Sequence, residues 1–120
     1  MAGRLTTHVL DTAHGCPAHG IEISLWSIES GSGERTRIKQ VYTDRDGRTE
    51  EPLLTDGELQ IGEYEMIFGV GSYFEGLHPN LPKPLFLDRI PIRFQIADAN
   101  AHYHIPLLVS PWSYSTYRGS

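Results

Sequence analysis

Residues 102–109 read HYHIPLLV, a pattern typical of a β-strand with one buried face. The side chains of a β-strand alternate between the two faces of its sheet. The odd positions of the stretch carry the apolar side chains that would face a core: Tyr103, Ile105, Leu107 and Val109. Both histidines stand at even positions. The pattern therefore predicts a strand with one buried face and with His102 and His104 side by side on the other face.

Similar short segments recur along the chain between its 12 glycines and 8 prolines. They are rich in β-branched and aromatic residues and nearly evenly spaced: 5–11, 21–29, 35–43, a short piece after Gly47, 64–70, 90–97, 101–109 and 113–118. About eight strands at this spacing are typical of a sandwich or a barrel. The sequence therefore predicts an all-β fold.

Two local signals break the run of strands. Residues 72–77 predict a helix of one or two turns, with Ser72 as its N-cap and Glu75 three residues later, as in a capping box. Residues 44–47, DRDG, predict a turn between strands in which Gly47 takes a positive φ.

The size of the chain indicates one domain spanning residues 1–120, because 120 residues are too few for two ordinary domains and no repeat or linker divides them. The net charge of −5 argues against nucleic acid and anionic membranes as partners, since both need a basic surface.

The lone Cys16 excludes an internal disulfide and a multi-cysteine zinc site. With neither a secretory signal nor a membrane-spanning stretch, a cytoplasmic protein is expected.

The first strand repeats the alternation of residues 102–109. In residues 5–11, LTTHVLD, the positions of Leu5, Thr7 and Val9 share the inward face, whereas Thr6, His8 and Leu10 point outward. Three histidines, His8, His102 and His104, are thus expected on outer faces of sheets. They are either solvated surface residues or candidates for chemistry, including a zinc site with His102-x-His104 and His8 as ligands.

Several motifs resemble functional sequences but fail at key positions. DRDG cannot open a calcium loop, because Tyr42 and Leu53 would stand at its first and twelfth positions. Residues 69–71, GVG, continue to Phe74 where a dinucleotide fingerprint needs glycine. The three remaining histidines, which stand in Gly/Pro-rich loops, are expected to have no catalytic role: His14, His19 and His78.

Four segments carry a resemblance to a known family, in family order and at compatible spacing: 5–18, 42–48, 102–108 and 114–120. The sequence resembles the transthyretin-like proteins from Leu5 to Ser120. The terminal Tyr-Arg-Gly-Ser at 117–120 marks the 5-hydroxyisourate hydrolase branch rather than the hormone-carrying transthyretins.

The resemblance implies a fold that agrees with the independent strand count. It is a two-sheet transthyretin-like (prealbumin-like) β-sandwich of about eight strands with one short helix after the fifth strand. It also implies a homotetramer, a dimer of dimers, with active sites in a channel at the dimer–dimer interface. A two-fold axis there would bring together copies of His8, His104 and Tyr117.

The implied activity is hydrolysis of 5-hydroxyisourate to 2-oxo-4-hydroxy-4-carboxy-5-ureidoimidazoline in urate degradation. Water attacks a ring amide carbonyl, a step that needs a base, oxyanion stabilisation and a group to orient the ring. Histidine and arginine cover this chemistry, so no metal or organic cofactor is expected.

The resemblance implies catalytic roles for His8, Arg48, His104 and Ser120, and substrate binding by His8, Arg48 and Tyr117. His104 is the preferred base and His8 positions the water or substrate, although these two roles are interchangeable at this level. Ser120 carries a hydroxyl and the terminal carboxylate, either of which could relay a proton or orient a histidine.

Two rival functions remain open. One is a non-enzymatic carrier of small aromatic ligands, against which the His8, Arg48, His104 and Tyr117 set argues. The other is a zinc hydrolase with His8, His102 and His104 as ligands, which activity in the presence of a chelator would exclude.

Overall fold

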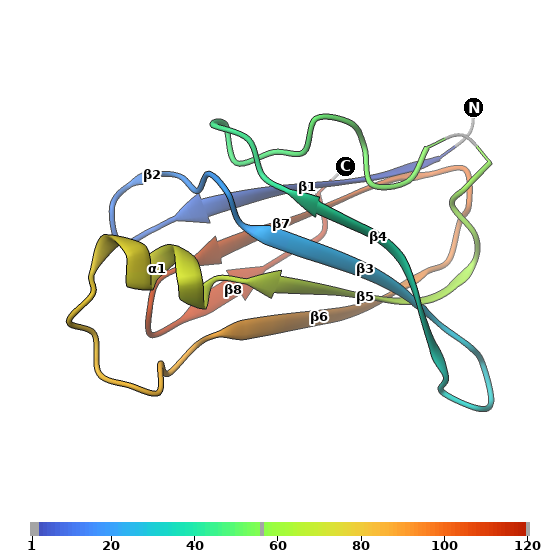
Figure 1. Ribbon diagram of the computed structural model, residues 1–120. Helices are drawn as coiled ribbons and strands as arrows, with labels where there is room; N and C mark the ends of the chain where they lie inside the picture. Colours follow the sequence, from blue (N-terminus) through green and yellow to red (C-terminus); the bar gives the residue numbers. More distant parts are fainter. Residues whose placement is uncertain (1–2, 56, 120) are drawn as a thin grey trace.

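Two four-stranded sheets pack face to face in the computed structural model, which describes residues 3–55 and 57–119 (Figure 1). The first sheet has the order β2-β1-β7-β8, formed by Cys16–Pro17, Arg4–Asp11, His102–Val109 and Tyr114–Thr116. The second has the order β4-β3-β5-β6, formed by Arg35–Tyr42, Glu22–Ile28, Gly62–Gly69 and Arg89–Ile96. Neighbouring strands are antiparallel except β1 and β7, which are parallel. The predicted all-β sandwich is confirmed.

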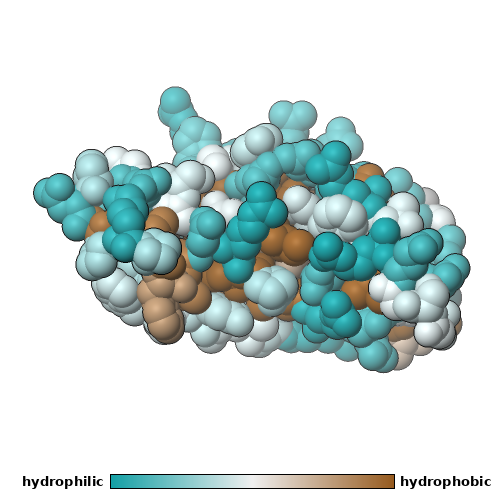
Figure 2. Space-filling view, turned by 60° about the horizontal axis from the view of Figure 1, so that its bottom comes forward, coloured by the Kyte–Doolittle hydropathy of each residue, from teal (hydrophilic) through white to brown (hydrophobic). Residues whose placement is uncertain are grey.

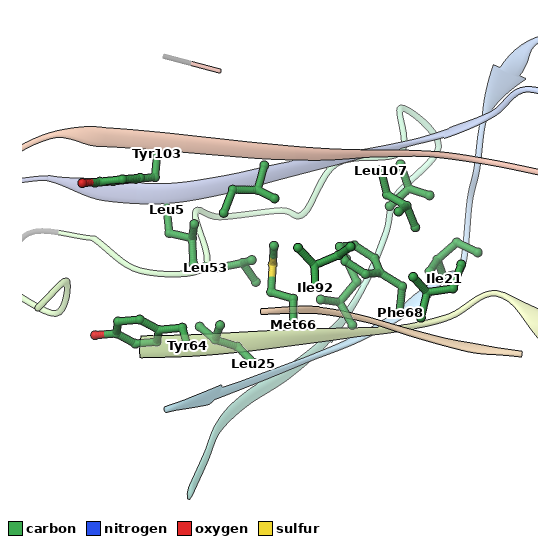
Figure 3. Close-up of a cluster of buried hydrophobic side chains, with 14 of the residues drawn as sticks. Leu5, Ile21, Leu25, Leu53, Tyr64, Met66, Phe68, Ile92, Tyr103 and Leu107 are labelled. Atoms are coloured by element: carbon green, nitrogen blue, oxygen red, sulfur yellow. The ribbon is translucent and has the colours of Figure 1, made fainter. Parts of the chain in front are cut away.

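The core lies between the sheets, where the apolar positions of the alternating strands meet (Figure 3). Leu5 of β1 and Leu107 of β7 approach from one sheet, and Met66 and Phe68 of β5 from the other. Each of these side chains is fully buried, which stabilises the fold by about 1.5–3 kcal/mol per side chain. This buried face fixes the register of β1 and β7 and so decides which residues point outward.

The prediction of a strand just after Gly47 is wrong. Residues 43–55 and 57–61 belong to a long connection between β4 and β5, part of which runs beside β1 (Figure 1). Its Leu53 and Leu54 are buried in the core, and Leu54 makes an isolated bridge to Leu5. The eighth strand is instead β2, whose two residues pair with Leu10 and Asp11 and are too few to produce an alternating pattern.

The helix α1, Gly71–Leu77, follows β5 as predicted, but Ser72 is not its N-cap. The N-cap is Val70, which makes no side-chain capping bond. The backbone amides of Val70 and Gly71 both donate to the carbonyl of Asp88, which starts the helix directly after β5. Phe74 anchors α1 in the core.

A buried carboxylate ties α1 to the end of β1. Asp11 Oδ2 accepts hydrogen bonds from Tyr73 Oη at 2.8 Å and from His14 Nδ1 at 2.7 Å. Asp11 Oδ1 accepts from the amides of Ala13 and His14. Burial raises the pKa of Asp11, but these hydrogen bonds outweigh burial and hold the pKa below its ordinary value.

The surface in Figure 2 is largely hydrophilic, with hydrophobic side chains visible between the polar ones. Among the described residues, 3–55 and 57–119, no helix has the length and apolar character needed to cross a bilayer.

Candidate active site

The parallel pairing of β1 with β7 gathers three histidines on the outer face of the first sheet. In this register Thr6 lies opposite His104, Arg4 opposite His102 and His8 opposite Pro106. His8, His102 and His104 are all half-buried, whereas the alternate positions of both strands are buried. The predicted outward placement of the three histidines is confirmed.

The hydroxyl of Thr6 joins two of these histidines. Thr6 Oγ1 lies 2.8 Å from His104 Nδ1 and 2.9 Å from His102 Nε2. Both hydrogen bonds connect β1 with β7, and the residues that they join are 96 and 98 positions apart in the sequence. Thr6 is not among the predicted site residues, although the alternation of residues 5–11 places it on the same face as His8.

His8 is held by the turn that follows β4. Its Nε2 lies 2.7 Å from the carbonyl oxygen of Asp46. Because a carbonyl only accepts hydrogen bonds, Nε2 carries the proton, and a neutral His8 presents a lone pair at Nδ1. The partner of His8 thus selects one tautomer.

Gly47 allows this turn to approach β1 closely. Its φ is 76°, as the sequence predicts, and its carbonyl accepts a hydrogen bond from the amide of Val9 at 2.8 Å. A Cβ at Gly47 would lie 2.4 Å from the Val9 carbonyl and 3.2 Å from His8 Cδ2. Only glycine fits the left-handed conformation and the contact together.

Arg48 stands at the end of the same turn. Asp44 Oδ1 accepts from the backbone amide of Arg48 at 3.1 Å, and the Arg48 carbonyl accepts from the amide of Asp44 at 2.8 Å. The exposed Arg48 side chain lines a shallow hollow beside Thr6. The structure therefore places Arg48 beside Thr6, the residue whose hydroxyl lies within hydrogen-bond distance of His102 and His104.

The surroundings of His104 favour its neutral form. Burial lowers the pKa of His104, and the charges of Arg48, His102 and His8 lower it further. Burial also lowers the pKa of His102, with the charges of Arg4 and Arg118 acting in the same direction. Neutral imidazoles at physiological pH can accept protons.

The C-terminal segment passes directly against His104. Gly119 and His104 form an isolated antiparallel bridge, and a Cβ at Gly119 would lie 3.2 Å from His104 Cδ2. Arg118 places its guanidinium carbon 4.0 Å from the ring centre of Tyr103. Tyr117 is exposed, and the predicted site residue Ser120 lies outside the described residues.

The predicted zinc ligands do not converge on one point. His102 Nε2 and His104 Nδ1 are both directed at the hydroxyl of Thr6. Nε2 of His8 is directed at the carbonyl of Asp46 instead. In the part of the chain that the structure describes, no group of three His, Cys, Asp or Glu side chains is arranged to hold a metal ion.

Known proteins share both the sequence and this architecture. The model of the HIUase/Transthyretin family matches residues 5–119. A 5-hydroxyisourate hydrolase of Ralstonia nicotianae is 57% identical over 118 residues, which cover 98% of this chain and 99% of that protein. The crystal structure of an (S)-allantoin synthase has a TM-score of 0.92 at 45% identity, covering 99% of this chain and 44% of that one. Sea bream transthyretin in complex with thyroxine has a TM-score of 0.85 at 26% identity, covering 97% of this chain and 94% of that one.

Proposed function

The chain belongs to the HIUase/Transthyretin family, and from this premise we propose that it hydrolyses 5-hydroxyisourate in urate degradation. The observation that carries the proposal is the 57% identity to a 5-hydroxyisourate hydrolase over nearly the full length of both chains. The carrier function is not favoured, since identity to the thyroxine-bound transthyretin is only 26%. The half-buried histidines of β1 and β7 also give this face a polar character that an apolar ligand does not need.

In the proposed reaction His104 is the general base. Its Nε2 takes a proton from water, and the hydroxide attacks the carbonyl carbon of a ring amide. The C–N bond then breaks, and the proton passes to the leaving nitrogen. The product is 2-oxo-4-hydroxy-4-carboxy-5-ureidoimidazoline. The low pKa of His104 suits this role, because the base must be unprotonated at the start.

The other predicted residues bind and orient the substrate in this proposal. The exposed guanidinium of Arg48 donates hydrogen bonds to the carbonyl oxygen as negative charge develops there. His8, held in one tautomer by Asp46, positions the water. Tyr117 flanks the ring, and Ser120 orients a histidine or relays a proton.

Assembly into a homotetramer belongs to the same proposal. The hollow that Thr6 and Arg48 line in the described part of a single chain is shallow and open, whereas substrate sites are usually concave enough to bury most of a ligand. A second copy packed across a two-fold axis would enclose the histidine face at the dimer–dimer interface. The cytoplasm is the proposed location, with no nucleic acid or membrane partner.

The decay of 5-hydroxyisourate, followed by ultraviolet absorbance, tests the activity. Urate oxidase generates the substrate in the cuvette, and the spontaneous decay rate is subtracted. We expect acceleration in proportion to protein concentration, unchanged after treatment with a chelator. Loss of activity in chelator, restored by zinc, would favour the zinc hydrolase. A folded protein that leaves the spontaneous rate unchanged would refute the proposed function.

A further inference from the structure

The hydroxyl of Thr6 has two histidine partners but only one proton to give. Oγ1 lies 2.8 Å from His104 Nδ1 and 2.9 Å from His102 Nε2. Both contacts are short enough to be true hydrogen bonds. When both rings are neutral, the fully paired arrangement has one histidine donating to Thr6 while Thr6 donates to the other. The tautomers of the two histidines are therefore coupled.

The direction of this coupling follows from the role of His104. A base that acts through Nε2 needs its lone pair there, so its Nδ1 carries the proton and donates to Thr6. Thr6 then donates to Nε2 of His102. Resting on the proposed function, we propose that Thr6 and His102 form a proton relay that carries the charge away from His104 during hydrolysis.

The relay moves one proton at each link. Water gives a proton to His104 Nε2 as the water oxygen bonds to the carbonyl carbon. His104 Nδ1 then releases its proton to Thr6 Oγ1. Thr6 in turn passes its hydroxyl proton to Nε2 of His102. His104 is then neutral in the other tautomer, and His102 is the cation. When the C–N bond breaks, the three transfers reverse, and His104 Nε2 gives its proton to the leaving nitrogen. No proton is gained or lost over the cycle.

The charged neighbours of the two histidines suit a reversible relay. Arg48, His102 and His8 lie close enough to His104 for positive charge on them to lower its pKa, and Arg4 and Arg118 act in the same way on His102. Both rings are half-buried, and burial together with these charges holds the pKa of each below its ordinary value. Because both ends of the relay are neutral at rest, neither end traps the proton.

Variants of Thr6 test the relay against a matched control. Thr6→Val removes the hydroxyl at nearly constant volume, and Thr6→Ser retains it. Thr7→Val is the control, because the Thr7 hydroxyl also makes a hydrogen bond from β1 to β7 but donates it to the backbone carbonyl of Ile105. We expect Thr6→Val to lower kcat at least about tenfold, within the about 10²–10⁴-fold worth of acid–base assistance. KM should change little, and Thr6→Ser and Thr7→Val should keep near wild-type kcat.

His102→Gln separates a relay from mere positioning. Glutamine still accepts a hydrogen bond from Thr6 but cannot take up a proton. The relay predicts the same loss of kcat as in Thr6→Val, with no further loss in the double variant. Near wild-type kcat in His102→Gln or Thr6→Val would overturn the relay, whereas an inactive wild-type protein would instead refute the proposed function.

Imidazole ¹⁵N spectra of the wild-type protein provide a readout that does not depend on activity. At neutral pH we expect the proton of His104 on Nδ1 and that of His102 also on Nδ1, with Nε2 free in both rings. Spectra of His102→Gln and His104→Asn assign the signals. A proton on Nε2 of His104 would contradict the proposed direction.

Discussion

The hydrogen-bond partners of His8 and His104 differ in whether they allow the histidine to change its tautomer. The carbonyl of Asp46 can only accept, so His8 cannot exchange its tautomer without breaking its 2.7 Å bond. The hydroxyl of Thr6 can donate or accept, so His104 can exchange its tautomer within the same bond. This difference supports the assignment of His104 as base and of His8 as a positioning group, which the sequence leaves interchangeable.

Arg48 should control the pH dependence of the reaction. The base must be neutral, so activity rises as pH increases through the pKa of His104, which lies below 6.5. Arg48→Gln removes a cation that lowers this pKa, so the acid limb of the kcat/KM profile should move to higher pH. Activity should also fall about 10²–10³-fold, because a donor to the oxyanion is lost.

The control for Arg48 is Arg45→Gln, in the same turn, which should change neither the limb nor the rate. If the acid limb of the kcat/KM profile keeps its position in Arg48→Gln, the charge of Arg48 does not act on His104.

At the scale of elements, the close approach of the 44–48 turn to β1 should be sensitive to a single methyl group. Gly47→Ala adds a Cβ that clashes with the Val9 carbonyl and forces alanine to a φ of 76°. We expect a loss of about 1–3 kcal/mol in the free energy of unfolding, measured by urea denaturation, and a lower kcat because His8 and Arg48 shift.

Gly57→Ala is the matched control for the turn. Gly57 also has a positive φ, of 81°, but a Cβ there would meet nothing within 4 Å. Gly57→Ala should lower the free energy of unfolding without lowering kcat. Equal effects on kcat in the two variants would contradict the proposed link between the turn and the site.

The contact between α1 and β1 depends on the buried carboxylate of Asp11. Asp11→Asn leaves donors facing an amide that cannot accept all of them, and we expect a loss of about 1–3 kcal/mol in the free energy of unfolding at pH 7. The pKa of Asp11 is lowered from 3.8 on folding, so its contribution is full above 3.8 and is lost as pH falls through the lower folded value.

Urea denaturation at several pH values measures the difference between wild type and Asp11→Asn. Asp98→Asn, an exposed aspartate that accepts one backbone amide, is the control and should have little effect. A difference that stays constant down to pH 2 would contradict this account of Asp11.

Alternation in the sequence predicted the strands that have one buried face. Leu5, Thr7 and Val9 in β1 and the odd positions of β7 are buried as expected. β2 could not be predicted, because its two residues are held by pairing with β1 rather than by an apolar face. The segment after Gly47 resembled a strand, but Leu53 and Leu54 reach the core from an irregular connection instead.

In the candidate site, too, alternation in the sequence predicts some features, whereas others depend on how distant segments pack. The outward placement of His8, His102 and His104 follows from alternation alone, and the structure confirms it. The link through Thr6 does not follow, because it depends on the parallel register of two strands separated by most of the chain. The contact of Gly119 with His104 depends likewise on the path of the tail.

For the molecule as a whole, the proposed homotetramer places the site between copies of the chain. The histidine face and the exposed Tyr117 lie on an open surface of the single chain, and substrate must be shielded from bulk water for the charges to act strongly. If the proposed homotetramer forms, multi-angle light scattering should give the mass of four chains of 13.5 kDa. A monomer with full activity would contradict the proposed location of the site.

The role of His104 as base is tested by the decay rate of 5-hydroxyisourate with wild-type protein and with His104→Asn at equal concentration. Light scattering must first show that both proteins have the same assembly. We predict clear acceleration by the wild type and a spontaneous rate with His104→Asn, because asparagine cannot accept a proton from water. Equal acceleration by both proteins would contradict the assignment of His104 as the base. No acceleration by either protein would contradict the hydrolase itself.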